Sequence, residues 1–164
     1  MKIAISAEST NDLTQELLQK YDIKVIPYEI VLKDRTFKDG EMTTEELFDY
    51  VDKNGTLPKT NAINEYEYTE YFTELRKEYD AVIHVSLSSG LTSSTGNAER
   101  ASKNVDNVFV VDSLSLSTGI GLLCIYAREL ADAGVEPSEI QQRVQQRNLL
   151  EVLKFFLELF VEFH

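Results

Sequence analysis

The segment "SSGLTSSTG" (88–96) concentrates six hydroxyl side chains and two glycines between an apolar run (81–87) and a helix-like run (97–105). The N-terminus of a helix offers unpaired N–H groups and partial positive charge, which favour a bound carboxylate or phosphate. Serine and threonine add neutral donors, and glycine lets a ligand approach the backbone. The alternative is that these residues only cap the helix.

Two further segments of this kind follow predicted strands, "AESTN" (7–11) and "DSLSLSTG" (112–119). The loop "LPKTNAIN" (57–64) adds Thr60 and Asn61. Ligands of open parallel sheets bind beyond the carboxyl ends of the strands, so these segments are expected to meet at one edge. Three such segments indicate a site for an anionic head group, while helix capping remains the alternative for each of them.

The residue patterns of most catalytic and metal sites are missing. There is no G-x-x-x-x-G-K-[ST] phosphate loop and no G-x-S-x-G nucleophile segment. His84 and His164 are the two histidines, and His84 lies within a predicted strand, where a packed imidazole is expected. No Cys/His cluster has metal-binding spacing, so no metal is expected. Glu8 and Asp112 lie at the expected sheet edge, where an acidic residue more often caps a helix or holds a loop.

The elements that must position these residues alternate between short apolar strands and helices. Predicted strands cover 2–6, 23–32, 81–87 and 107–112, and predicted helices cover 10–21, 43–55, 64–79, 118–134 and 137–147. Thr43 and Glu46 form a capping box, and Pro27 indicates an edge or a bulge in the second strand. This alternation predicts an α/β fold, a parallel sheet with helices on both faces.

Composition restricts the class of protein. The chain has 164 residues, enough for one domain with a substantial core. Its net charge of −12 argues against nucleic acid and anionic membranes as partners, because both attract basic surfaces. The single cysteine, Cys124, is expected to be a buried thiol in a reducing, cytoplasmic compartment. Neither a secretory leader nor a transmembrane segment is expected.

A series of motifs resembles, in order, those of the DegV family of bacterial fatty-acid-binding proteins. For example, "AESTNDL" is similar to the family's T-D-S-T-x-D-L, and "LPKTNAIN" is similar to its L-P-K-T-S-Q-P. The matching segments are 7–13, 37–51, 57–64, 85–101 and 108–123. Together they cover about residues 2–145, and they imply the fold of the DegV N-terminal domain.

The resemblance implies a ligand and the residues that hold it. The carboxylate of a long-chain fatty acid would be bound by Thr60, Thr92 and Ser93, at positions that match the family motifs. The acyl chain would run in an apolar tunnel, and a fatty-acid kinase would receive the bound acid. In this interpretation the protein is a carrier without a cofactor, and it is not an enzyme.

Three further residues are candidates for supporting roles. Asp39 matches the acidic residue that the family places near the carboxylate, and Ser9 and Asn61 belong to the hydroxyl-rich segments. The sequence also departs from the family pattern. A family aspartate is Glu8 here, and a family glycine is Ser93, so backbone approach at that position is expected to be tighter.

The C-terminal segment departs most from the family. Residues 1–147 are expected to form the DegV-like domain, and 148–164 a strongly apolar helix that does not resemble the family's second domain. One alternative is therefore a truncated or frame-altered fragment that keeps the fold without useful lipid binding. Another is a protein-interaction module that forms a homodimer through this helix. The last is a small phosphoryl-transfer or hydrolytic enzyme that uses the hydroxyl-rich segments.

Overall fold

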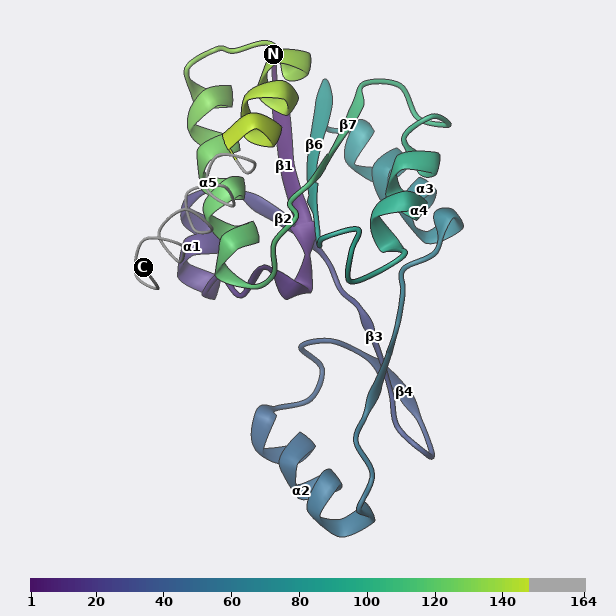
Figure 1. Cartoon of the computed structure of the whole chain (residues 1–164). Coiled ribbons are helices and arrows are strands. Elements are labelled where there is room, and N and C mark those ends of the chain that lie inside the picture. Colours follow the sequence, from purple (N-terminus) through teal and green to yellow (C-terminus); the bar gives the residue numbers. More distant parts are fainter. Residues whose placement is uncertain (148–164) are drawn as a thin grey trace, which may run out of the picture.

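The computed structural model describes residues 1–147, a helix-covered parallel sheet with a smaller projecting sheet (Figure 1). The strands are β1 (Ile3–Glu8), β2 (Ile23–Ile26), β3 (Glu29–Val31), β4 (Thr36–Lys38), β5 (Lys59–Asn61), β6 (Ala81–Ser86) and β7 (Val108–Asp112). The helices are the 3-10 turn η1 (Ser9–Asn11), α1 (Gln15–Lys20), α2 (Thr44–Asn54), α3 (Glu65–Arg76), α4 (Ser94–Ala101) and α5 (Thr118–Asp132), followed by a helix over 137–147. The predicted helix over 148–164, and the homodimer that it would form, lie outside the described residues.

The larger sheet has the strand order β2-β1-β6-β7, and all three neighbouring pairs are parallel. Every residue of the central strands β1 and β6 is buried, which explains why both read as nearly continuous apolar runs. Helices α1 and α5 cover one face, and α3 and α4 cover the other (Figure 1). The predicted α/β fold with helices on both faces is confirmed.

The helix over 137–147 protects the edge strand β7. The Gln141 side chain donates to the carbonyl oxygen of Val110 at 2.7 Å. The Gln145 amide accepts from the backbone N–H of Asp112 at 3.2 Å and donates to its carbonyl oxygen at 2.9 Å. Because an edge strand with unpaired backbone groups can pair with another chain, these side chains reduce that risk.

The smaller sheet forms an arm that projects from the larger one, with α2 at its far end (Figure 1). The predicted single strand over 23–32 was wrong, because the chain leaves the larger sheet at Pro27 and begins β3 in the smaller one. Proline lacks the N–H that a continuous ladder requires. The segment 57–64, expected to be a loop, contains β5, which pairs antiparallel with β3.

Helix α2 begins with the predicted capping box. The Thr43 hydroxyl accepts from the Glu46 backbone N–H at 3.2 Å, and the Glu46 carboxylate accepts from the Thr43 N–H at 2.9 Å. Gly55 ends the helix at φ 63°, in the left-handed region that favours glycine. Both ends of this helix follow from local sequence.

The helix predicted over 10–21 begins later than expected. Residues Ser9–Asn11 form the turn η1, and α1 starts only after Thr14, whose hydroxyl accepts from the Leu17 N–H at 3.3 Å. The cause is Asn11, whose side chain donates to the Glu8 carbonyl oxygen at 2.7 Å and accepts from the Leu13 N–H at 2.9 Å. Such local side-chain bonds compete with helix formation.

Gly121 of α5 marks a close approach to η1. A Cβ at this position would lie 2.7 Å from Leu13 Cδ2 and 2.9 Å from the Asn11 carbonyl oxygen. We therefore expect Gly121→Ala to lower the free energy of unfolding by about 2 kcal/mol, because an added methyl group in a well-packed core forces its neighbours to shift. The measurement is urea denaturation. The matched control is Gly96→Ala in α4, where a Cβ meets its nearest neighbour at an ordinary 3.5 Å and no loss is expected. Equal stability of the two variants would contradict this packing argument.

Candidate functional site

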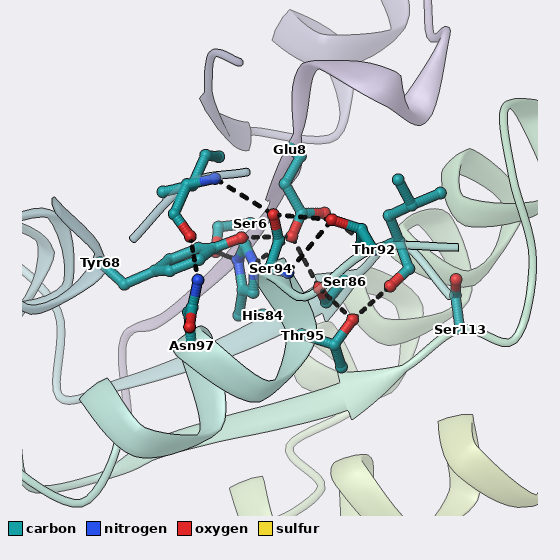
Figure 2. A network of polar contacts seen from close by, with 12 residues as sticks. Ser6, Glu8, Tyr68, His84, Ser86, Thr92, Ser94, Thr95, Asn97 and Ser113 are labelled. Atoms are coloured by element: carbon teal, nitrogen blue, oxygen red, sulfur yellow. Dashed lines mark hydrogen bonds and ion pairs between the residues drawn. The ribbon is translucent and has the colours of Figure 1, made fainter. Parts of the chain in front are cut away.

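The carboxylate of Glu8, at the end of β1, is buried in a network that joins β1, α3 and β6 (Figure 2). Its Oε1 accepts from the Tyr68 hydroxyl at 2.6 Å and from the Ser86 hydroxyl at 2.7 Å. His84 Nε2 lies 3.2 Å from the same oxygen. Its Oε2 accepts from the Leu87 backbone N–H at 3.0 Å. Glu8 therefore anchors the start of the hydroxyl-rich loop that follows β6.

The network keeps this buried carboxylate ionised. Burial alone raises the pKa of Glu8, but attraction to His84 and hydrogen bonds from His84, Tyr68 and Ser86 outweigh it and lower the pKa to about 2. Burial and the neighbouring Glu8 raise the pKa of Tyr68, so its hydroxyl remains a donor. Glu8 was expected either to contribute a carboxylate to a site or to hold a loop, and its bond to the Leu87 N–H shows that it holds a loop.

Ser6, His84 and Glu8 are arranged as hydroxyl, imidazole and carboxylate. Ser6 Oγ lies 2.8 Å from His84 Nδ1, and His84 Nε2 lies 3.2 Å from Glu8 Oε1. The same order of groups activates a serine nucleophile in hydrolases. All three residues are 0% exposed, however, and the rings of Tyr68 and Phe72 pack edge-on against the imidazole. A substrate has no access to Ser6, and the expectation that His84 is a packed imidazole is confirmed.

A cavity of about 380 Å³ lies between the larger sheet and the arm. Its polar lining comes from Thr10, Asp39, Thr60, Thr92 and Ser93. Its apolar lining comes from Tyr28, Ile30, Ala62, Leu87 and Leu91. The combination of an apolar lining with a few convergent polar groups is typical of a small-molecule site.

Elements far apart in the sequence build this cavity. Thr92 and Ser93 belong to the loop between β6 and α4, whereas Thr60 lies on β5 of the arm. Ile30 and Thr60 are register partners in β3 and β5, so both side chains occupy the same face of the small sheet. Asp39 follows β4 and is held by its N–H, which donates to the Tyr28 carbonyl oxygen at 2.8 Å.

The buried hydroxyl of Ser94 orients Thr92. Ser94 Oγ accepts from the Tyr28 hydroxyl at 2.9 Å and from the Ile63 N–H at 3.2 Å. Thr92 Oγ1 donates to Ser94 Oγ at 3.1 Å and accepts from the Ser94 N–H at 3.1 Å. These bonds hold the Thr92 side chain in position at the cavity that it lines.

The structure brings together four of the six predicted site residues. Thr60, Thr92, Ser93 and Asp39 line the same cavity. Ser9 lies instead at a neighbouring cleft of about 620 Å³, which Asp39 also borders, and its hydroxyl accepts from the Tyr28 N–H at 3.2 Å. Asn61 is exposed on the arm, where its amide donates to the Glu29 carboxylate at 3.3 Å.

Sequence reasoning missed six of the ten lining residues, among them Thr10 and Tyr28, which carry hydroxyl groups. Thr10 belongs to the segment "AESTN" that was singled out, but it was assigned to the start of a helix. Tyr28 directly follows Pro27, where the chain crosses from the larger sheet to the arm. The unusual proline within a predicted strand was the available signal for this crossing.

The third hydroxyl-rich segment, 112–119, mainly satisfies its own polar groups. Asp112 Oδ1 accepts from the Ser89 N–H at 3.1 Å and from the Leu114 N–H at 3.0 Å. The Ser113 hydroxyl donates to the Ser115 carbonyl oxygen at 3.1 Å. This segment therefore braces the loop that follows β6, and the side chain of Ser117, the N-cap of α5, makes no capping hydrogen bond.

Within residues 1–147, no group of three or more His, Cys, Asp or Glu side chains is placed to hold a metal ion. The helices of the same residues include none long and apolar enough to cross a membrane. Cys124 is a buried free thiol, as expected, and burial raises its pKa.

A family model described as "Uncharacterised protein, DegV family" matches residues 2–155. The chain belongs to the DegV family. A DegV domain-containing protein of Staphylococcus aureus is 34% identical over 158 residues, which are 95% of this chain and 56% of the relative. A relative from Thermotoga maritima, named fatty acid-binding protein, is 32% identical over 152 residues, 90% of this chain and 53% of the relative.

A solved DegV structure has the same fold. The fatty acid-binding DegV protein from Bacillus subtilis superimposes with a TM-score of 0.82 at 30% identity, covering 90% of this chain and 54% of that protein. The motif resemblance to DegV is confirmed. The chain spans about half the length of the curated relatives it matches.

Proposed function

We propose that this chain binds a long-chain fatty acid, with the carboxylate held by Thr60, Thr92 and Ser93. The observation that carries the proposal is the cavity, in which these three hydroxyl residues meet beside an apolar wall. DegV relatives of matching fold are named as fatty-acid-binding proteins, which supports the same ligand.

Neutral donors suit a carboxylate in this protein. The net charge is −12, and none of the described residues that line the cavity is cationic. A hydrogen bond to a charged group is roughly twice as strong as one between neutral groups, so a few hydroxyls are sufficient to orient the head group.

The acyl chain supplies most of the proposed affinity. Each buried methylene contributes about 0.8 kcal/mol. A cavity of about 380 Å³ lies toward the small end of ligand sites, so we propose that it takes the head group and the first part of the chain. The remainder would run in an apolar tunnel that needs surface beyond residues 1–147.

We also propose that the chain is a carrier that presents its acid to a fatty-acid kinase in the cytoplasm and performs no chemistry itself. The enclosed Ser6–His84–Glu8 arrangement supports this, because its serine is sealed from any substrate. A fragment that keeps the fold without retaining lipid is the second candidate. The observation in its favour is that the chain spans about half the length of its relatives.

The test is solvent extraction of the purified chain followed by mass spectrometry. We expect one fatty acid per chain, and at least a tenfold lower occupancy in Thr60→Val/Thr92→Val at limiting ligand, because two donors to a charged group are lost. The matched control is Thr60→Ser/Thr92→Ser, which keeps both hydroxyls and should retain the acid. If the folded wild-type chain is purified without fatty acid and also fails to bind added fatty acid, the carrier proposal is wrong and the fragment alternative takes its place.

A further inference from the structure

Two chain segments join the arm to the larger sheet, one at Tyr28 between β2 and β3 and one at Ile63 between β5 and α3 (Figure 1). Both residues are buried. Among the described residues, no hydrogen bond or ion pair joins residues 29–61 directly to the larger sheet or to its helices. The hydrogen bonds that hold the arm against the sheet are therefore those made at these two segments.

The first turn of α4 holds both segments. Ser94 Oγ lies 2.9 Å from the Tyr28 hydroxyl oxygen and accepts from the Ile63 N–H at 3.2 Å. The Asn97 side chain donates to the Ile63 carbonyl oxygen at 2.6 Å (Figure 2), so α4 binds both backbone polar groups of Ile63. Ser94 is fully buried, so water does not replace a hydrogen bond that is lost there.

The same Ser94 hydroxyl also contacts a proposed head-group residue. Thr92 Oγ1 donates to Ser94 Oγ at 3.1 Å, and Thr92 lines the cavity together with Thr60 of the arm. Ser94 itself is not among the residues that line the cavity. One buried hydroxyl therefore links the wall that carries Thr92 to both segments that carry the arm and Thr60.

We propose that Ser94 is a positioning residue, which holds the arm where Thr60 and Thr92 can bind the same carboxylate. This inference rests on the proposed function and adds to it a residue that acts without touching the ligand. A hydrogen bond that is lengthened by about 1 Å is lost. A small shift of the arm would therefore separate Thr60 from a carboxylate that Thr92 binds.

The test uses three variants. Ser94→Ala removes the hydroxyl that contacts both segments and Thr92. Asn97→Ala removes the bond to the second segment and leaves the contact between Ser94 and Thr92 in place, so it separates an effect of the arm from a direct effect on Thr92. Ser102→Ala, at the end of α4, is the matched control, because its hydroxyl bonds within the helix.

The position of the arm is measured without ligand, from the distance between spin labels at Asp52→Cys on α2 and Glu129→Cys on α5. Both positions are exposed, and the natural Cys124 is a buried thiol. We expect a broader distribution of label distances in the two variants that weaken the contacts of α4 with the arm. The wild type and the control variant should give the same narrow distribution.

Binding of palmitic acid to the delipidated proteins is the second measurement. We expect Ser94→Ala to bind about tenfold more weakly than the wild type, and Asn97→Ala about threefold more weakly. Ser102→Ala should bind as the wild type does. A loss in Asn97→Ala, which leaves Thr92 and its partner intact, would show that the position of the arm sets the affinity.

Two results would overturn this inference while the proposed function survives. One is a wild-type distribution of label distances in Ser94→Ala, and the other is a looser arm that binds palmitic acid as tightly as the wild type. If Ser94→Ala does not fold, Asn97→Ala decides by the same two measurements. A wild-type chain that binds no palmitic acid would overturn the proposed function and the role of Ser94 in binding, and it is told apart from the other results because the wild type itself fails.

Discussion

Replacing Glu8 with glutamine is expected to lower the free energy of unfolding by about 3 kcal/mol at pH 7, because it removes a buried carboxylate that accepts several hydrogen bonds. The carboxylate accepts from Tyr68, Ser86 and the Leu87 N–H, and His84 lies beside it. A glutamine amide has one acceptor oxygen and would turn an N–H₂ group toward one of these donors. The measurement is the urea midpoint and slope. Glu70→Gln is the control, since Glu70 is exposed on α3.

The same substitution is expected to remove part of the acid sensitivity. The pKa of Glu8 falls from 4.5 to about 2 in the folded protein, so its stabilisation is complete above pH 4.5 and is lost as the pH falls toward 2. The difference in stability between wild type and Glu8→Gln should therefore shrink by about 2 kcal/mol between pH 7 and pH 3. A difference that is constant over this range would show that the carboxylate is not preferentially ionised in the folded state.

Phe72→Ala is expected to have the largest effect on stability, a loss of about 4 kcal/mol. The Phe72 side chain is 0% exposed, stacks on Tyr68 with ring centroids 5.6 Å apart, and meets the His84 ring at 5.3 Å. Its removal would leave a cavity beside the Glu8 network. Because domains of this kind are stable by about 5–15 kcal/mol in total, the variant would lose much of its stability.

Phe48→Ala is the matched control for this prediction. Phe48 is on α2 at the end of the arm and is 66% exposed, so its truncation should change stability by about 0.5 kcal/mol or less. Chemical denaturation of both variants under the same conditions makes the comparison. Similar losses for the two variants would mean that the rings around His84 do not form the core of the domain.

The candidate site was predictable where local sequence carries the signal. Thr92 and Ser93 lie in a hydroxyl-rich segment after a buried strand, and the rule for parallel sheets places that segment at the ligand-binding edge. Thr60 and Asp39 came from the motif resemblance to DegV. Their approach to Thr92 depends on an arm that sequence periodicity did not reveal, since its strands have only three residues each.

The Glu8 network was not predictable from local pattern. Ser6 and His84 are register partners in β1 and β6, although they are 78 residues apart in the sequence. A shift of one residue in this register would turn every side chain of a strand to the other face of the sheet. The identity of the residues was visible in the sequence, and their contact was not.

The sequence by itself determined the alternation of strands and helices, the capping box of α2 and the glycine that ends it, because these depend on periodicity and on hydrogen bonds between residues three or four apart. Only the tertiary structure decided which hydroxyls find hydrogen-bond partners within the protein. The Ser113 hydroxyl bonds within its own loop, the Thr92 hydroxyl donates to Ser94, and the Thr10 hydroxyl has no partner among the described residues. The three residues have similar side chains, and long-range register and packing give each of them a different set of partners.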